Sequence, residues 1–204
     1  MSRLSTSFVL GFHGCDQAVA RDVISGSLNL TQSDRDYDWL GPGTYFWEAD
    51  SLRAREWAED KARRREIAEP AVVGAVIDLG NCLDLLVREN LELLRNAHAA
   101  LQATVDEAGL TMPRNSNPRG HSGSDDLLRY LDCAVIRHLH DIVDESAARA
   151  GAITGVDMTR FDTVRGLFVE GDPIYPGSGF RGRTHTQIAV RSPAAIKGYF
   201  VPRP

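Results

Sequence analysis

The segment 71–79, AVVGAVIDL, constrains the fold more than any other part of this chain. Apolar side chains fall on both faces of the strand that it would form, which is the pattern of a strand with neighbours on both sides. Gly80 and Asn81 follow it and are suited to end it. The sequence therefore predicts a sheet with this segment at its centre.

Further strand signals lie towards both ends of the chain. Residues 8–14, FVLGFHG, form a short apolar run closed by a glycine, typical of a buried strand that ends in a tight turn. An aromatic run follows the tight turn Gly41-Pro42-Gly43. The remaining predicted strands are 164–169, 186–190 and 196–201, with a brief strand at 28–30.

Helical spacing occurs after the first strand, after the aromatic run and in the middle of the chain. A short helix is predicted from Asp16 to Gly26, and a second begins at a cap formed by Asp50 or Ser51 and ends before Pro70. Arg53 is expected on the solvated face of that second helix.

Residues 83–108 and 125–150 are rich in Leu, Ala, Glu and Arg at helical spacing, and a loop at 111–123 separates them. We expect a single domain over residues 1–204, with a helical insertion at about 83–150. The predicted fold class is α+β with a mostly antiparallel sheet.

Composition excludes several classes of protein. The chain has 204 residues, of which 43% are hydrophobic and 25% charged, as in a soluble globular protein that buries one core. A net charge of −5 argues against binding nucleic acid mainly through its phosphates, although residues 63–65 and 181–183 are locally basic.

The three cysteines contain no CxxC pair and have no histidine at metal-ligand spacing, so no metal site is predicted and a reduced, cytoplasmic setting is expected. No membrane span or standard signal peptide is expected either.

Three separated motifs carry the functional signal. The pair His13-Gly14 ends the first predicted strand, and Gly41-x-Gly43-x-Tyr45-Phe46 precedes a helix. The third motif is the segment 187–196, QIAVRSPAAI. In this order the motifs resemble the ADP-ribosyltransferase superfamily, specifically its poly(ADP-ribose) polymerase-like, diphtheria-toxin-type branch. The resemblance covers about the first 60 residues and about the last 25.

The resemblance implies a split sheet that binds NAD+ as co-substrate. The Gly14 backbone would bond the nicotinamide amide, and His13 would bond a ribose hydroxyl. Tyr45 would stack on the cationic nicotinamide ring, with Gly43 in the same cofactor-binding segment. Phe46 would point to the opposite side, into the core.

Gln187 departs from the family pattern, since it stands where active members usually have a catalytic glutamate. A glutamine can bond the ribose 2′-hydroxyl, but it carries no charge and accepts no proton from a nucleophile. Glu170 is a second catalytic candidate that would supply the missing carboxylate, although a glutamate in such a loop is ordinarily solvated. His185, on the same face as Gln187, and Arg183 are candidate substrate contacts.

The function that the resemblance implies is mono-ADP-ribosylation of a protein or nucleic-acid acceptor, as in bacterial toxins and defence effectors, with an inhibitor or antitoxin protein as a further partner. Alternatives are a non-catalytic NAD+ or ADP-ribose-binding module, an NAD+ glycohydrolase, and an RNA 2′-phosphotransferase-like protein, which fits the acidic balance badly. Taken singly, the same residues also fit structural roles: His13 in a turn, Gly41 and Gly43 in a tight turn, and Gln187 bonded to backbone.

Overall fold

The central feature of the protein is one sheet, in the order β4-β5-β6-β2-β1-β3-β7. The computed structural model describes residues 8–120, 125–154 and 160–203. All neighbouring strands are antiparallel except β4 and β5, which are parallel. The α+β class with a mostly antiparallel sheet is confirmed. The strands are β1 (Phe8–Asp16), β2 (Thr44–Glu48), β3 (Pro70–Asp78), β4 (Cys82–Asp84), β5 (Thr163–Phe168), β6 (His185–Val190) and β7 (Ile196–Phe200).

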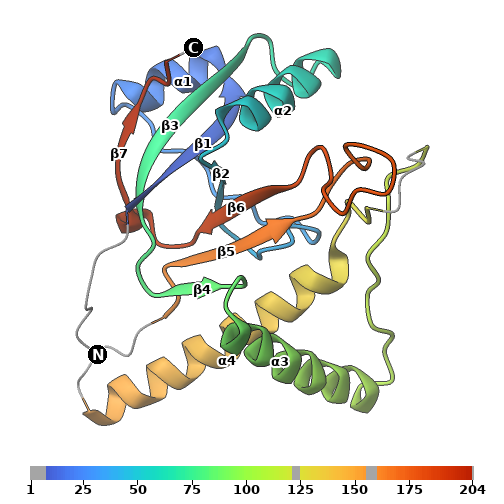
Figure 1. Cartoon of the computed structure of the whole chain (residues 1–204). Helices are drawn as coiled ribbons and strands as arrows, with labels where there is room; N and C mark the ends of the chain where they lie inside the picture. Colours follow the sequence, from blue (N-terminus) through green and yellow to red (C-terminus); the bar gives the residue numbers. More distant parts are fainter. Residues whose placement is uncertain (1–7, 121–124, 155–159, 204) are drawn as a thin grey trace.

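Four α-helices occur in the described ranges, and they lie at two ends of the sheet (Figure 1). The helices are α1 (Gln17–Ile24), α2 (Ser51–Arg63), α3 (Arg88–Glu107) and α4 (Tyr130–Thr154). Asp16 caps α1 by accepting a hydrogen bond from the Ala18 amide at 2.9 Å. Asp50 caps α2 through the Arg53 amide at 2.8 Å, which confirms one of the two predicted caps.

Alternation along β6 shows how the two faces of the sheet are covered. Ile188 and Val190 join a first core cluster, whereas Ala189 between them joins a second cluster on the opposite face. The first cluster includes Ala20 and Val23 of α1. The second includes residues of α3 and α4, namely Ala97, Val135, Ile136 and Leu139. Since all three β6 residues are buried, this strand lies in the middle of the core.

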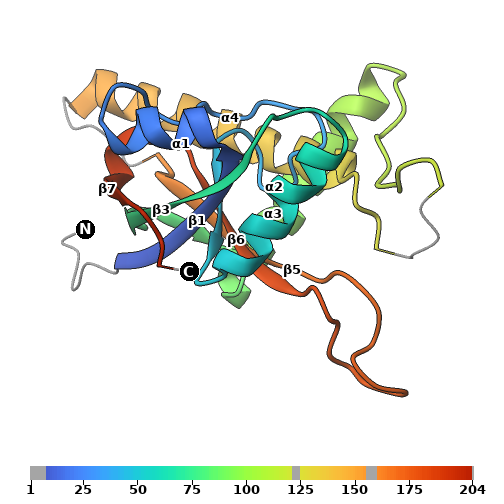
Figure 2. The ribbon, with the colours of Figure 1, turned by 90° about the horizontal axis from the view of Figure 1, so that it is seen from above.

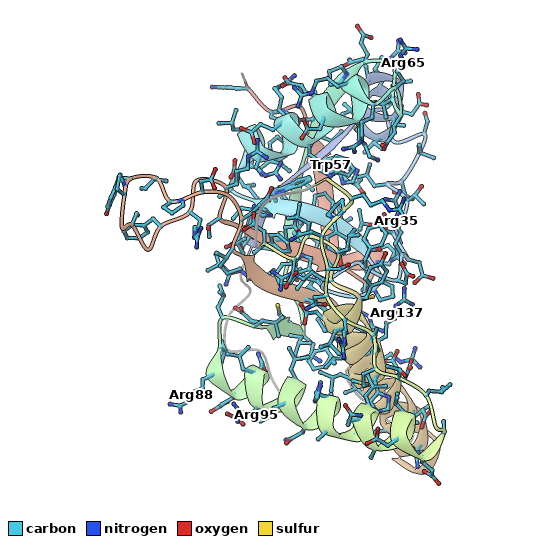
Figure 3. The ribbon with its side chains drawn as sticks, turned by 90° about the vertical axis from the view of Figure 1, so that its right-hand side faces the viewer. Arg35, Trp57, Arg65, Arg88, Arg95 and Arg137 are labelled. Atoms are coloured by element: carbon cyan, nitrogen blue, oxygen red, sulfur yellow. The ribbon has the colours of Figure 1, made fainter. Side chains whose placement is uncertain are left out.

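The second face also carries α2, at the β1 and β3 end of the sheet. A Cβ atom on Gly14 would lie 2.2 Å from the Ala54 carbonyl oxygen, so only glycine lets α2 approach this closely. Figure 3 shows α2 above the strands, the α3 and α4 pair below them, and Trp57 at the α2 side. The second face is therefore covered at both ends by helices, with β2, β6 and β5 between.

Several predicted boundaries were wrong. Residues 28–30 form no strand, because Leu30 packs into the first cluster without backbone pairing. Residues 82–84 form strand β4 instead of opening a helix, and α4 begins at Tyr130 instead of 125. The segment 71–79 is an internal strand as predicted, since β3 pairs with both β1 and β7. It does not lie at the centre of the sheet, because β7 beside it is an edge strand. No helix in the described ranges is both long enough and apolar enough to cross a membrane.

Candidate functional site

The strands β1 and β2 pair over a very short distance and then separate. Their register joins Gly11 to Glu48 and Phe12 to Trp47, and the Ala49 amide donates to the Leu10 carbonyl at 2.9 Å. Alternate residues of a strand direct both backbone groups to the same side, so Gly14 faces β2 as Leu10 does. Gly14 lies beyond the last β1–β2 pair in the described chain. Its N–H and C=O therefore face the split between the two strands.

His13 occupies the split with its side chain. Its Nδ1 lies 2.7 Å from the Tyr45 carbonyl oxygen, and because a carbonyl only accepts, Nδ1 carries the hydrogen. Burial lowers the pKa of His13, so the ring is neutral near pH 7 and Nε2 is an acceptor. The ring contacts Phe46 and Trp57, with centroids 5.8 and 6.4 Å away.

The Tyr45 side chain points to the second face of the sheet and is anchored at its tip. Its hydroxyl donates to the Gly41 carbonyl at 2.8 Å and accepts from the Leu40 amide at 3.0 Å. Burial raises the pKa of this phenol well above 10, so it stays protonated. Phe46 belongs to the first cluster, which confirms that the two rings point to opposite faces.

Gly43 has a packing role in the structure. A Cβ atom at this position would lie 2.9 Å from the Val190 carbonyl oxygen of the neighbouring strand. The glycine thus permits close approach of the start of β2 to β6.

A continuous chain of ring contacts links the split to the Gln187 side chain. Successive centroids lie 6.4, 5.6, 6.2, 5.6 and 5.1 Å apart. We call this set the aromatic chain; its members are His13, Trp57, Trp47, His185, Phe168 and Trp39. At its end, the Trp39 indole Nε1 donates to Gln187 Oε1 at 2.6 Å.

The environment of Gln187 is defined by its strand neighbours and by Trp39. Gln187 pairs with Trp47 on β2 and with Gly166 on β5. A Cβ atom at Gly166 would lie 2.7 Å from the Trp39 ring, so the glycine makes room for the indole. The side-chain oxygen of Gln187 thus accepts a hydrogen bond, and the side-chain amide nitrogen of this half-buried residue is the remaining donor.

Glu170 is buried, contrary to the expectation of a solvated loop acid. Both of its carboxylate oxygens accept from Arg53 Nη2, at 3.0 and 2.9 Å. Arg53 was expected to be solvated, yet only 12% of its side chain is exposed. Arg183 Nη1 lies farther from the carboxylate, at 3.8 Å. The Arg53–Glu170 pair ties α2 to the loop that follows β5.

His185 lies beside this ion pair. Its Nδ1 donates to the Arg183 carbonyl at 2.6 Å and lies 3.9 Å from Glu170. Burial lowers the pKa of His185, which leaves a neutral ring with Nε2 as acceptor. His185 and Gln187 share a face, as predicted, because they are two residues apart on β6.

Several buried polar atoms around Trp47 have no hydrogen-bond partner among the described residues. They are the indole nitrogen of Trp47, Nε and Nη1 of Arg53, and Nε2 of His185. The Trp47 ring contacts both other side chains, since the Arg53 guanidinium lies 5.8 Å and the His185 ring 6.2 Å from it. Buried polar groups are ordinarily hydrogen-bonded in folded proteins, so these atoms are exceptions within this protein.

The predicted site residues therefore form connected groups. His13, Gly14 and Tyr45 meet at the split, while Glu170, Arg183 and His185 meet at the loop after β5. The aromatic chain joins both groups to Gln187. Sequence reasoning missed Trp39, Arg53 and Trp57; the one available signal was a large tryptophan inside the polar segment 31–40.

Within the described ranges, no group of three or more His, Cys, Asp or Glu side chains is placed to hold a metal ion. Comparisons with family models, curated proteins and solved structures found no match to this chain.

Proposed function

We propose that this protein binds NAD+ at the β1–β2 split and transfers its ADP-ribose, as a mono-ADP-ribosyltransferase, to a protein or nucleic-acid acceptor or to water. The observation that carries the proposal is the orientation of the Gly14 backbone. Its N–H and C=O face the split beyond the last β1–β2 pair. A primary amide such as that of nicotinamide offers the complementary acceptor and donor.

Two neighbouring groups support the proposal. His13 presents Nε2 as an acceptor beside Gly14, because its other ring nitrogen is bonded to the Tyr45 carbonyl. A ribose hydroxyl is a fitting donor for it. Tyr45 supplies a half-buried aromatic ring next to the split, and its anchored hydroxyl fixes the ring plane. An aromatic face attracts the cationic nicotinamide ring of NAD+.

The reaction itself makes modest demands on acid catalysis. The bond between ribose C1′ and the nicotinamide nitrogen breaks, and its electron pair leaves with the nicotinamide, which becomes neutral. The ribose then resembles an oxocarbenium ion, which a nucleophile attacks at C1′. The protein contributes mainly by binding NAD+ in a reactive conformation and by stabilising the positive charge of the oxocarbenium-like ribose.

The test is nicotinamide release from NAD+ by the purified protein, measured with and without cell lysate as a source of acceptor. His13→Ala and Tyr45→Ala are expected to lower the rate at least about tenfold, since each removes an interaction with the reacting end of NAD+. Tyr45→Phe keeps the ring and is expected to retain most of the rate. The control is His98→Ala, an exposed histidine on α3. Full rates in both alanine variants contradict the proposal.

The second candidate is a non-catalytic module that binds NAD+ or ADP-ribose. It is favoured because both predicted catalytic side chains already have hydrogen-bond partners within the protein. Gln187 accepts from Trp39, and Glu170 accepts from Arg53. Calorimetric titration with NAD+ separates the two candidates, because the module binds it without releasing nicotinamide.

Gln187→Glu sharpens this comparison. The Trp39 N–H is a donor, so a carboxylate at this position is expected to be tolerated. Turnover gained only in this variant supports the module, whereas turnover in the wild type supports the enzyme.

A further inference from the structure

A cavity of about 470 Å³ lies between the helical pair and the β5 side of the sheet. Small-molecule sites in proteins commonly have volumes of about 300–1,000 Å³. None of His13, Gly14, Tyr45 and Gln187 lines this cavity. It is therefore distinct from the β1–β2 split.

The cavity wall is mainly apolar and contains two aromatic rings. Trp39 and Phe168 both line it and meet edge to face, with centroids 5.1 Å apart and ring planes at 68°. Leu94 of α3 and Leu131 of α4 contribute aliphatic surface from the other side. Surfaces of this kind favour a flat apolar body.

The polar part of the wall is centred on Arg129, whose guanidinium lies 5.0 Å from the Phe168 ring. Its Nη2 donates to the Asp125 carbonyl at 3.0 Å, and Nη1 approaches Asp132 at 3.3 Å. These contacts hold the guanidinium in place. Its Nε is buried and has no hydrogen-bond partner within the described ranges.

Among the charged groups of the wall, Arg129 is the one that can bond an anion. Arg95 and Arg129 are the two arginines of the wall and Asp132 is its acid, and Arg95 is paired along α3 with Glu92. Asp132 also accepts from the Asn115 amide at 3.0 Å, so its carboxylate is shared between two donors. A negative group on the ligand would be bonded by the Arg129 guanidinium, whose Nε–H has no partner within the described ranges.

We propose that this cavity binds a small aromatic molecule that carries one anionic group. The aromatic body lies against Trp39 and Phe168, and the anionic group bonds Arg129. The inference does not depend on NAD+ binding at the split.

The test uses the intact chain and two fluorescent probes with the same rings. One is 8-anilinonaphthalene-1-sulfonate, which carries one anionic group, and the other is neutral N-phenyl-1-naphthylamine. Titration is expected to show one saturable site for the sulfonate probe, with energy transfer from tryptophan. Arg129→Gln is expected to lower the affinity for the sulfonate probe about tenfold, the effect of losing one charge-assisted hydrogen bond. The affinity for the neutral probe is expected to change less than about twofold.

Two further variants test the location. Leu94→Trp fills the cavity and is expected to abolish binding of both probes, with Leu131→Phe as a second filling variant. The control is Phe180→Ala, which removes an apolar side chain that is 70% exposed elsewhere, and it is expected to leave binding unchanged. Any of three results overturns the proposal: binding that does not saturate, an equal loss of affinity for both probes in Arg129→Gln, or full binding in both filling variants.

Discussion

The buried pair between Arg53 and Glu170 offers the sharpest test of the structure. The two side chains are 12% and 10% exposed and are joined by two hydrogen bonds to one nitrogen. Glu170→Ala removes the only hydrogen-bond acceptor found for the Arg53 guanidinium among the described residues, because Nε and Nη1 already lack one. Glu56 approaches it only to 3.8 Å. The variant therefore leaves a buried guanidinium that has lost its hydrogen-bonded carboxylate and keeps only the more distant, half-exposed Glu56.

Breaking a buried ion pair in this way costs about 3–5 kcal/mol in the free energy of unfolding. For a chain of this size the cost corresponds to a fall in Tm of roughly 6–20 °C. The measurement is urea unfolding at 25 °C, followed by tryptophan fluorescence. The matched control is Glu145→Ala, which breaks the exposed pair with Arg149 and is expected to cost less than about 1 kcal/mol.

A double variant, Arg53→Met with Glu170→Leu, removes both charges and is expected to recover most of the lost stability. A cost for Glu170→Ala as small as that for Glu145→Ala contradicts this prediction, because it means that water reaches the pair. Glu170→Gln keeps an acceptor for Arg53. Loss of nicotinamide release in a stable Glu170→Gln protein would assign the carboxylate a role in the reaction beyond holding α2.

Two further predictions concern packing and pH. Gly14→Ala places a methyl group 2.2 Å from the Ala54 carbonyl oxygen. It is expected to lower the free energy of unfolding in urea by about 1–3 kcal/mol. The control is Gly179→Ala, which has no atom within 4 Å of the added methyl group and is expected to leave stability unchanged. Burial lowers the pKa of His140 from 6.5 to about 4, so the unfolded chain binds more protons and stability falls as pH decreases between these values. From pH 7 to 5 the free energy of unfolding of the wild type is expected to fall by about 2 kcal/mol more than that of His140→Leu. A His98→Asn control is expected to follow the wild type. Equal decreases in the wild type and in His140→Leu would contradict the prediction.

Much of the fold could be predicted because its signals are local. The apolar run at 71–79 specified a strand with two neighbours, and Asp50 specified the start of α2. The position of β4 could not be predicted, because its short apolar segment is also compatible with the start of a helix. Its pairing with β5 joins residues that are far apart in sequence, such as Cys82 and Thr163.

The proximity of some of the motif residues could be predicted for the same reason. The motifs identified His13, Gly14 and Tyr45, which lie together at the split. The burial of Arg53 and Glu170 was missed because each residue alone has the pattern of a solvated charge, and only tertiary contact pairs them. Trp39 was missed because a turn-rich segment gives no sign that its indole reaches a strand at Gln187.

The parallel pairing of β4 with β5 limits how the chain can be shortened. Two parallel neighbours cannot be joined by a tight turn, because the connection has to return along the full strand before the second strand begins; natural crossovers use about a dozen residues or more. In Figures 1 and 2, α3 and α4 form this return path. A chain that keeps β4 beside β5 therefore always needs some crossover in place of the helical pair.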